Sequence, residues 1–175
     1  MRTGLMAWCL GLLLALASVG GAQAQIWTEY RPAGGKYIVL MPGKPQESTE
    51  SVPVGGGRTV LMYQALIERQ ERAYFGSYAD YPQEAVSGQS PQTLLDNVRN
   101  GSAKGHSVRN EKHLTIVRNP GREYVIVRTD GVIAVTRIFL VGNRLYQIIA
   151  AGRTGVEDHP DTPWFLESFR LLTGN

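Results

Sequence analysis

Three apolar segments near the end of the chain are separated by tight-turn residues, and this spacing restricts the fold more than any other feature. Asp130-Gly131 separates Glu123–Thr129 from Val132–Leu140, and Gly142-Asn143 separates the latter from Leu145–Ala151. Asp-Gly is typical of a two-residue hairpin turn, whose central residues need positive φ. The pattern therefore predicts a three-stranded antiparallel meander.

The strands of this meander are apolar on both of their sides. Tyr124–Val127 and Tyr146–Ala150 show little polar alternation, which favours a sheet that is covered on both faces. Before the meander, His113–Val117 is predicted as another strand and Asn119-Pro120-Gly121 as its turn. A single helix cannot cover two faces, so we expect several segments to pack on this sheet.

The first half of the domain contains a compact strand and then a long hairpin. Tyr37–Met41 is an apolar strand that Pro42-Gly43 ends. Thr59–Glu68 and Ala73–Tyr81 flank a charged turn and predict the hairpin. Lys44–Gly57 contains two prolines and three consecutive glycines, so it is predicted as a surface loop, and function in this region is expected in that loop.

Two helices are predicted. Ser90 and Pro91 are typical of an N-cap and a first helical position, and this helix should end at Gly101 or Gly105. Trp164–Leu172 has apolar residues at helical spacing. Strands and helices together predict an α+β fold, in which helices pack on a twisted, mostly antiparallel β-sheet.

Residues 1–24 have the features of a secretory signal peptide. Arg2 precedes the apolar run Leu5–Val19, and Ala22-Gln23-Ala24 is an Ala-x-Ala cleavage site. The alternative is a membrane anchor, but the run is shorter than the roughly 20 residues that a bilayer requires. Cys9 lies far from the cleavage point, where a lipid-bearing cysteine would be. The chain is therefore expected to be exported to the periplasm or the extracellular space, with no stable membrane anchor after cleavage.

Residues 25–175 are predicted to form a single domain that is long enough to bury a core. Cys9 is the one cysteine of the chain, so the mature domain lacks disulfides, thiol nucleophiles and cysteine metal ligands. The formal net charge of the whole chain is +3, and its acids and bases are interspersed. No basic block is present to neutralise a row of phosphates, so nucleic acid is not expected as a partner.

Several of these segments occur in an order that resembles a known superfamily. The apolar strand that runs into Pro42-Gly43-Lys44-Pro45, the long hairpin, the middle helix, the meander and the closing Ser168-Phe169-Arg170-Leu171 are similar to the PsbP/Mog1-like superfamily, which includes exported bacterial proteins similar to DcrB. The resemblance implies an α/β/α sandwich around an antiparallel sheet and a last helix shorter than its spacing suggests. It also implies binding to other proteins and supplies no shared catalytic residue.

Motifs that could carry chemistry are few. Gly43-Lys44 resembles part of a phosphate-binding loop, but Pro45 follows where Ser or Thr is required and has no N–H to donate. His106 and His113 do not have the i, i+4 spacing of a helical ligand pair. Residues 157–161, Glu-Asp-His-Pro-Asp, are either a weak divalent-ion site or an acidic loop that caps the last helix. No catalytic residue, cofactor or firm metal site is predicted.

Charged residues interrupt the first two strands of the meander. Arg122 and Glu123 fall on one strand and Arg137 on the next. An isolated buried charge is very costly, so Arg137 must be paired or exposed. It either lines a groove that receives an acidic partner or forms a cross-strand ion pair with Glu123 or another acid.

Tyr74 and Tyr78 have the same parity on their strand, with Gly76 between them. They could form a shallow apolar platform for a ligand or partner, or they could be core residues beneath a helix. Taken together, these features predict a non-catalytic, exported protein that binds another protein of the bacterial envelope. The alternatives are a module that binds a small ligand beside the Tyr74/Tyr78 strand and an enzyme with a dispersed site.

Overall fold

The structure is a computed structural model, and it describes residues 26–55 and 57–172. The predicted signal peptide and its cleavage site lie outside the described residues. The elements are, in chain order, β1 (Thr28–Tyr30), β2 (Tyr37–Met41), β3 (Gln46–Gly55), β4 (Arg58–Arg69), β5 (Arg72–Asp80), α1 (Gln83–Ser87), α2 (Pro91–Ser102), β6 (Ser107–Ile116), β7 (Asn119–Val127), β8 (Ile133–Val141), β9 (Arg144–Gly152), α3 (Asp161–Glu167) and β10 (Arg170–Leu171).

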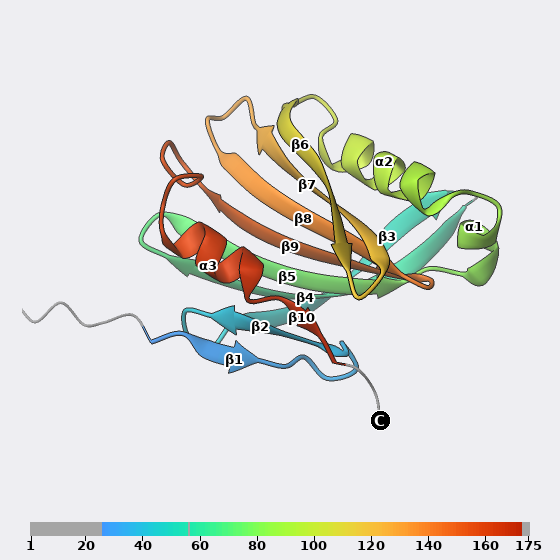
Figure 1. Ribbon diagram of the computed structural model, residues 1–175, viewed down its shortest axis with the longest axis horizontal. Coiled ribbons are helices and arrows are strands. Elements are labelled where there is room, and N and C mark those ends of the chain that lie inside the picture. The colour runs from blue at the N-terminus through green and yellow to red at the C-terminus, as the bar shows by residue number, and fades with distance from the viewer. Residues whose placement is uncertain (1–25, 56, 173–175) are drawn as a thin grey trace, which may run out of the picture.

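Most of these strands form one large antiparallel sheet. Its seven strands follow the order β3-β4-β5-β9-β8-β7-β6, and a smaller sheet has the order β1-β2-β10 (Figure 1). The predicted hairpin is β4–β5, and the predicted meander is β7–β8–β9. The prediction of an α+β fold with a mostly antiparallel, twisted sheet is therefore confirmed.

The large sheet is covered on both faces, as the apolar strands predict. Tyr124 and Ile126 of β7 lie in a core with Leu95 of α2, whereas Val125 between them lies in a core with Phe165 of α3. Successive side chains of a strand point to opposite faces, so one apolar strand supplies both cores. The small sheet joins α3 in covering the second face, because Val39 of β2 belongs to the same core as Phe165.

The segment predicted as a surface loop, Lys44–Gly57, is mostly the strand β3, so this prediction was wrong. β3 pairs antiparallel with β4, with Gln46 opposite Leu66. Pro53 lies on this edge strand, next to a register irregularity, which is where a sheet tolerates proline. The strand therefore owes its existence to hydrogen bonds with β4.

The turn predicted at Asn119-Pro120-Gly121 was also wrong, because β7 begins at Asn119. The chain reverses at Val117 and Arg118, whose φ angles are 45° and 66°. Neither residue is a usual choice for positive φ. Gly121 serves packing instead, since a Cβ there would lie 2.3 Å from the Phe139 ring.

The last predicted helix, Trp164–Leu172, is shorter than its apolar spacing suggests. α3 ends at Glu167, and Arg170 then pairs with Ile38 of β2 as part of β10. The Ser168 Oγ accepts a hydrogen bond of 2.9 Å from the Leu40 backbone N–H, which ties this junction to β2. Docking on β2 therefore replaces the last helical turn.

Candidate functional site

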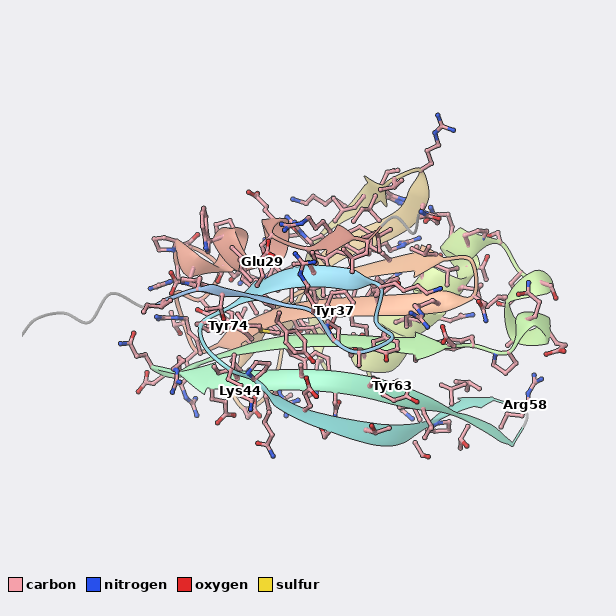
Figure 2. The ribbon with its side chains drawn as sticks, turned by 90° about the horizontal axis from the view of Figure 1, so that it is seen from below. Glu29, Tyr37, Lys44, Arg58, Tyr63 and Tyr74 are labelled. Carbon is pink, nitrogen blue, oxygen red and sulfur yellow. The ribbon has the colours of Figure 1, made fainter. Side chains whose placement is uncertain are left out.

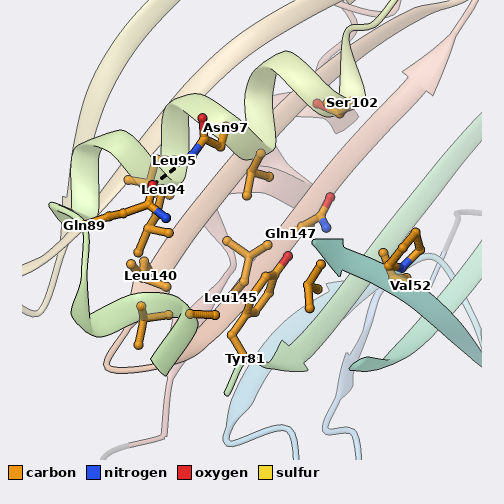
Figure 3. A pocket seen from close by; sticks show the side chains of 16 residues that line it. Val52, Tyr81, Gln89, Leu94, Leu95, Asn97, Ser102, Leu140, Leu145 and Gln147 are labelled. Carbon is orange, nitrogen blue, oxygen red and sulfur yellow. Dashed lines mark hydrogen bonds between the residues drawn. The ribbon is translucent and has the colours of Figure 1, made fainter. Parts of the chain in front are cut away.

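A cavity of about 390 Å³ lies between the α1–α2 region and the large sheet. Figure 3 shows α2 on one side of it and Val52 of β3 on the other, with Tyr81, Leu145 and Gln147 between them. Its lining residues come from β3, β8, β9, α1, α2 and the links before and after α1, and they are Val52, Pro53, Val54, Tyr81, Ala85, Val86, Gln89, Leu94, Leu95, Asn97, Val98, Gly101, Ser102, Leu140, Leu145 and Gln147.

The helix α2 forms one wall of this cavity because its apolar stripe is wider than the contact it makes with the sheet. Leu95 is fully buried against the sheet, and Leu94 and Val98 pack beside it at the edge of that core. The start of α2 is held by Ser90, whose Oγ accepts a hydrogen bond of 3.1 Å from the Thr93 backbone N–H. The predicted N-cap is therefore confirmed.

The link between β5 and α1, which contains Tyr81, forms another wall of the cavity and is held in place by Asn143. The Asn143 side chain donates a 2.7 Å hydrogen bond to the Tyr81 carbonyl oxygen, and the Tyr81 N–H donates to the Asn143 carbonyl at 2.9 Å. Burial raises the pKa of the Tyr81 hydroxyl, so this group is protonated at neutral pH and available as a hydrogen-bond donor. Tyr81 thus brings a neutral polar group into an apolar space.

The cavity carries polar groups but no formal charge. Asn97 donates to the Gln89 side chain at 3.1 Å, as the dashed line in Figure 3 marks. The Ser102 and Tyr124 hydroxyls are 3.1 Å apart. None of the described lining residues is Asp, Glu, Lys, Arg or His. The walls therefore fit a neutral, mainly apolar group. Among these lining residues, no ionisable side chain is present to act as a base and activate a hydroxyl nucleophile.

The structure brings Arg137 and Glu123 together. They are directly opposite each other on β8 and β7, and the Arg137 Nε donates to the Glu123 carboxylate at 2.5 Å. Lys112 of β6 lies 2.7 Å from the same carboxylate. Burial would raise the pKa of Glu123, but the hydrogen bonds from Lys112 and Arg137 outweigh it and lower that pKa. The cross-strand ion pair expected as one alternative is therefore confirmed.

Arg122 is directed to the other face of the sheet and is separated from that pair. Its side chain is buried, and its Nη1 lies 2.8 Å from Asp96 of α2 and 2.5 Å from Glu111 of β6. Its Nη2 donates to Gln92 at 3.2 Å. Arg122 therefore fastens α2 to the sheet, and the three charged residues singled out in the sequence do not form one site.

Tyr74 and Tyr78 are core residues, so an exposed platform of the two rings is not formed. Their exposed fractions are 0% and 5%. The Tyr74 hydroxyl donates to Asp161 at 3.3 Å, and the Tyr78 hydroxyl donates to the Ala33 carbonyl at 2.7 Å. Tyr78 nevertheless borders a second, smaller pocket beneath β1 and β2.

The acidic loop 157–161 directs two of its carboxylates toward arginines. Glu157 lies 2.5 Å from Arg109, and Asp161 lies 3.6 Å from Arg72.

Within residues 26–55 and 57–172, no group of three or more His, Cys, Asp or Glu side chains is arranged to hold a metal ion. No helix among the described residues has the length and apolarity needed to cross a membrane.

The sequence missed most of the cavity. Sequence patterns predict no helix or strand in residues 82–89 and a loop at Val52–Val54, although these segments line the cavity. The signal that was available is the apolar stripe of α2, whose residues Leu94 and Val98 line the cavity. A stripe alone cannot show whether its whole width is covered.

The fold that surrounds the cavity is an α+β sandwich built on an open antiparallel sheet. It is similar to a solution structure of cyanobacterial PsbP from Synechocystis sp. PCC 6803, with a TM-score of 0.49 and 16% identity over 89% of this chain and 98% of that chain. A crystal structure of a protein of unknown function from Pseudomonas aeruginosa matches with a TM-score of 0.40 and 11% identity, over 79% of this chain and 90% of that chain. No protein-family model and no curated protein sequence matches the chain. No family or function follows from similarities at this level.

Proposed function

We propose that the protein is an exported, non-catalytic binding module that attaches to another protein of the bacterial envelope. In this proposal the α1–α2 cavity receives an apolar group of the partner. The observation that carries it is the cavity itself: about 390 Å³, with apolar walls, neutral polar groups and no charged lining residue among those described. Export is supported by the signal-peptide features of residues 1–24.

The composition of the walls suits an anchor site for a partner side chain. Protein interfaces concentrate their binding energy in a few apolar or aromatic groups that fill well-desolvated pockets. A charged occupant would lose its hydration here without gaining an opposite charge, which is costly. An apolar occupant gains about 25 cal/mol for each Å² of apolar surface that it buries.

The test fills the cavity. Ala85 lines it from α1, so Ala85→Phe should occupy part of the space and abolish partner capture in a crosslinking pulldown from envelope fractions. Gln83→Phe adds the same ring to an exposed position of the same helix and should leave capture unchanged. Equal capture by the two variants, with both folded, would show that the partner does not use this cavity.

A second candidate is a module that binds a free small molecule, and the volume of the cavity favours it specifically. Ligand pockets usually measure roughly 300–1,000 Å³ and combine apolar walls with a few polar groups. Native mass spectrometry of the protein purified from envelope extracts would then detect a bound neutral molecule that Ala85→Phe displaces. A clean apo mass together with a captured protein supports the first candidate.

A further inference from the structure

We propose that the outer edge of β3 binds an extended peptide segment of a partner protein and that the pocket beside Glu47 receives a basic side chain of this segment. The proposal rests on the proposed function in one respect, namely that the partner is a protein. The pocket beside Glu47 shares no lining residue with the α1–α2 cavity, which β3 reaches only at its other end, through Val52–Val54. The peptide would add an eighth strand to the large sheet.

The edge of β3 is open and regular over most of its length. β3 is the first strand of the sheet order and, within residues 26–55 and 57–172, pairs with β4 alone, in register from Gln46 to Pro53. An unpaired strand edge presents backbone N–H and C=O groups that can bind another strand. Figure 2 shows β3 at the outer margin of the molecule, beside Tyr63 of β4.

The other edge of the same sheet is protected, which makes the open edge of β3 a specific feature. β6 has a register irregularity between Arg109 and Lys112, and Asn110 there has a φ of 55°. A bulge and a lysine are standard means of blocking edge pairing. Residues 46–52 of β3 contain no such irregularity and no Lys, Arg or Pro, and Pro53 and the irregularity after it lie at the far end of the strand.

A pocket of about 260 Å³ lies on one face of this edge. Its lining includes four tyrosine rings, and the residues are Tyr30, Pro32, Ala33, Tyr37, Glu47, Ser48, Thr49, Tyr63, Gln64 and Tyr78. Tyr63 is 42% exposed and stacks on Tyr78 with ring centroids 4.9 Å apart. Glu47 and Thr49 are opposite Ala65 and Tyr63 of β4 and therefore share their face of the sheet. A side chain from a strand added beside β3 can reach this pocket.

The charges of the pocket select a cation. The Glu47 carboxylate accepts a 2.8 Å hydrogen bond from the Tyr30 hydroxyl, and among the described residues no ion pair involves Glu47 or Glu50. Tyrosine faces and a carboxylate attract a guanidinium or an ammonium group. A second copy of this chain is a poorer occupant, because pairing β3 with β3 would bring acidic strands together.

The probe is a blocked nine-residue peptide of alternating threonine and valine with a central arginine and a lysine at each end, measured by fluorescence anisotropy. We expect saturable binding, and Glu47→Gln should weaken it about tenfold, since a charge-assisted contact contributes that much. Glu50→Gln is the matched control. Glu50 lies on the opposite face of β3 and does not line the pocket, so its change should alter affinity less than about twofold.

The backbone contribution is tested with two N-methylated peptides, each modified at alternate residues. Only one alternate set of amides faces β3, so one peptide should bind and the other should not. Equal binding of the two, or of a peptide in which glutamate replaces arginine and lysine, would overturn the proposal. A dimer of the protein that dissociates on peptide addition would assign the edge to a second copy instead. The two proposals fail separately. Glu47→Gln should bind the peptide more weakly but still capture the partner through the cavity, whereas Ala85→Phe should lose partner capture but still bind the peptide.

Discussion

Arg122 is a buried cation with two carboxylate partners on different elements. Its exposed fraction is 6%, and Asp96 and Glu111 approach the same Nη1 atom. Removing one member of a buried ionic group leaves the other members uncompensated, which costs about 3–5 kcal/mol when all are buried. Since these two carboxylates remain partly exposed, water can compensate part of the loss.

The first prediction follows from that geometry. Arg122→Ala should destabilise the protein by about 2–3 kcal/mol, less than for a fully buried group, because Asp96 and Glu111 lose their buried partner but keep Arg99 as a second one. Chemical denaturation followed by circular dichroism measures the change. Arg128→Ala, at an exposed pair with Asp130, is the control and should leave stability nearly unchanged. Similar losses in the two variants would contradict the structural role of Arg122.

Arg137 allows the second prediction, which separates stability from binding. Arg137→Ala should lower the melting temperature because it removes a hydrogen-bonded partner of the largely buried Glu123. Thermal unfolding checks this. A variant that keeps its melting temperature but loses a partner would instead favour the acidic-partner alternative considered from the sequence.

The pKa of Glu123 gives the third prediction, on pH dependence. Its pKa in the folded protein is lowered, because hydrogen bonds from Lys112 and Arg137 outweigh burial. A lowered folded-state pKa means that the stabilisation is complete above about pH 5 and is lost as the pH falls through the folded-state value. The stability difference between the native chain and Glu123→Gln should therefore shrink below about pH 4. A constant difference from pH 7 to pH 3 in urea unfolding would contradict this.

Arg137 and Arg122 differ in how far their partners could be predicted from the sequence. The pairing of Arg137 with Glu123 was an explicit alternative, since the Asp-Gly turn places the two strands side by side. The partners of Arg122 could not be found in that way. Asp96 lies on a helix and Glu111 within the register irregularity of β6, and no local spacing connects either of them to Arg122.

The helix α2 is the element on which the proposed cavity depends. Its position is set by the N-cap at Ser90, by Leu95 in the core and by the ion pairs of Arg122. In the fourth prediction, Ser90→Ala should cost about 1 kcal/mol, because the Thr93 N–H loses its hydrogen-bond acceptor. Denaturant unfolding measures the loss, and Ser90→Asp should restore most of it. A failure of Asp to restore stability would contradict a capping role.

The strand β3 is an element that its own residues do not predict. The prolines and glycines in and around it indicate a loop, and the polar run that begins at Gln46 has no apolar face to bury. Half of its backbone groups nevertheless pair with β4. An edge strand needs only one neighbour, so its existence depends on the neighbour more than on its own residues.

The whole molecule consists of two cores that share one sheet. The larger contains Phe165 with the small sheet, and the other contains Leu95 beneath α2. Because β7, β8 and β9 supply residues to each core, loss of packing on one face should weaken the other face as well. The chain should therefore unfold as one unit, as expected for a single domain.

The fifth prediction concerns whether the two cores unfold together. Leu95→Ala and Phe165→Ala should each lower stability by about 2–5 kcal/mol, since each deletes a fully buried side chain. Calorimetry should show one transition in each variant, shifted to lower temperature. Two separate transitions in either variant would show that the cores unfold independently.

Local chemistry accounts for what could be predicted from the sequence: the meander, the hairpin, the N-cap of α2 and a sheet covered on both faces. Each of these depends on side chains that are close along the chain or on strand periodicity. The partners of Arg122, the strand β3, the end of α3 and the α1–α2 cavity depend on segments far apart in the chain. The last of these exists because α2, Val52 and Tyr81 meet without filling the space between them. Contacts of this kind are decided by the packing of the whole chain, because the free energy that places each segment comes from surfaces that other segments supply.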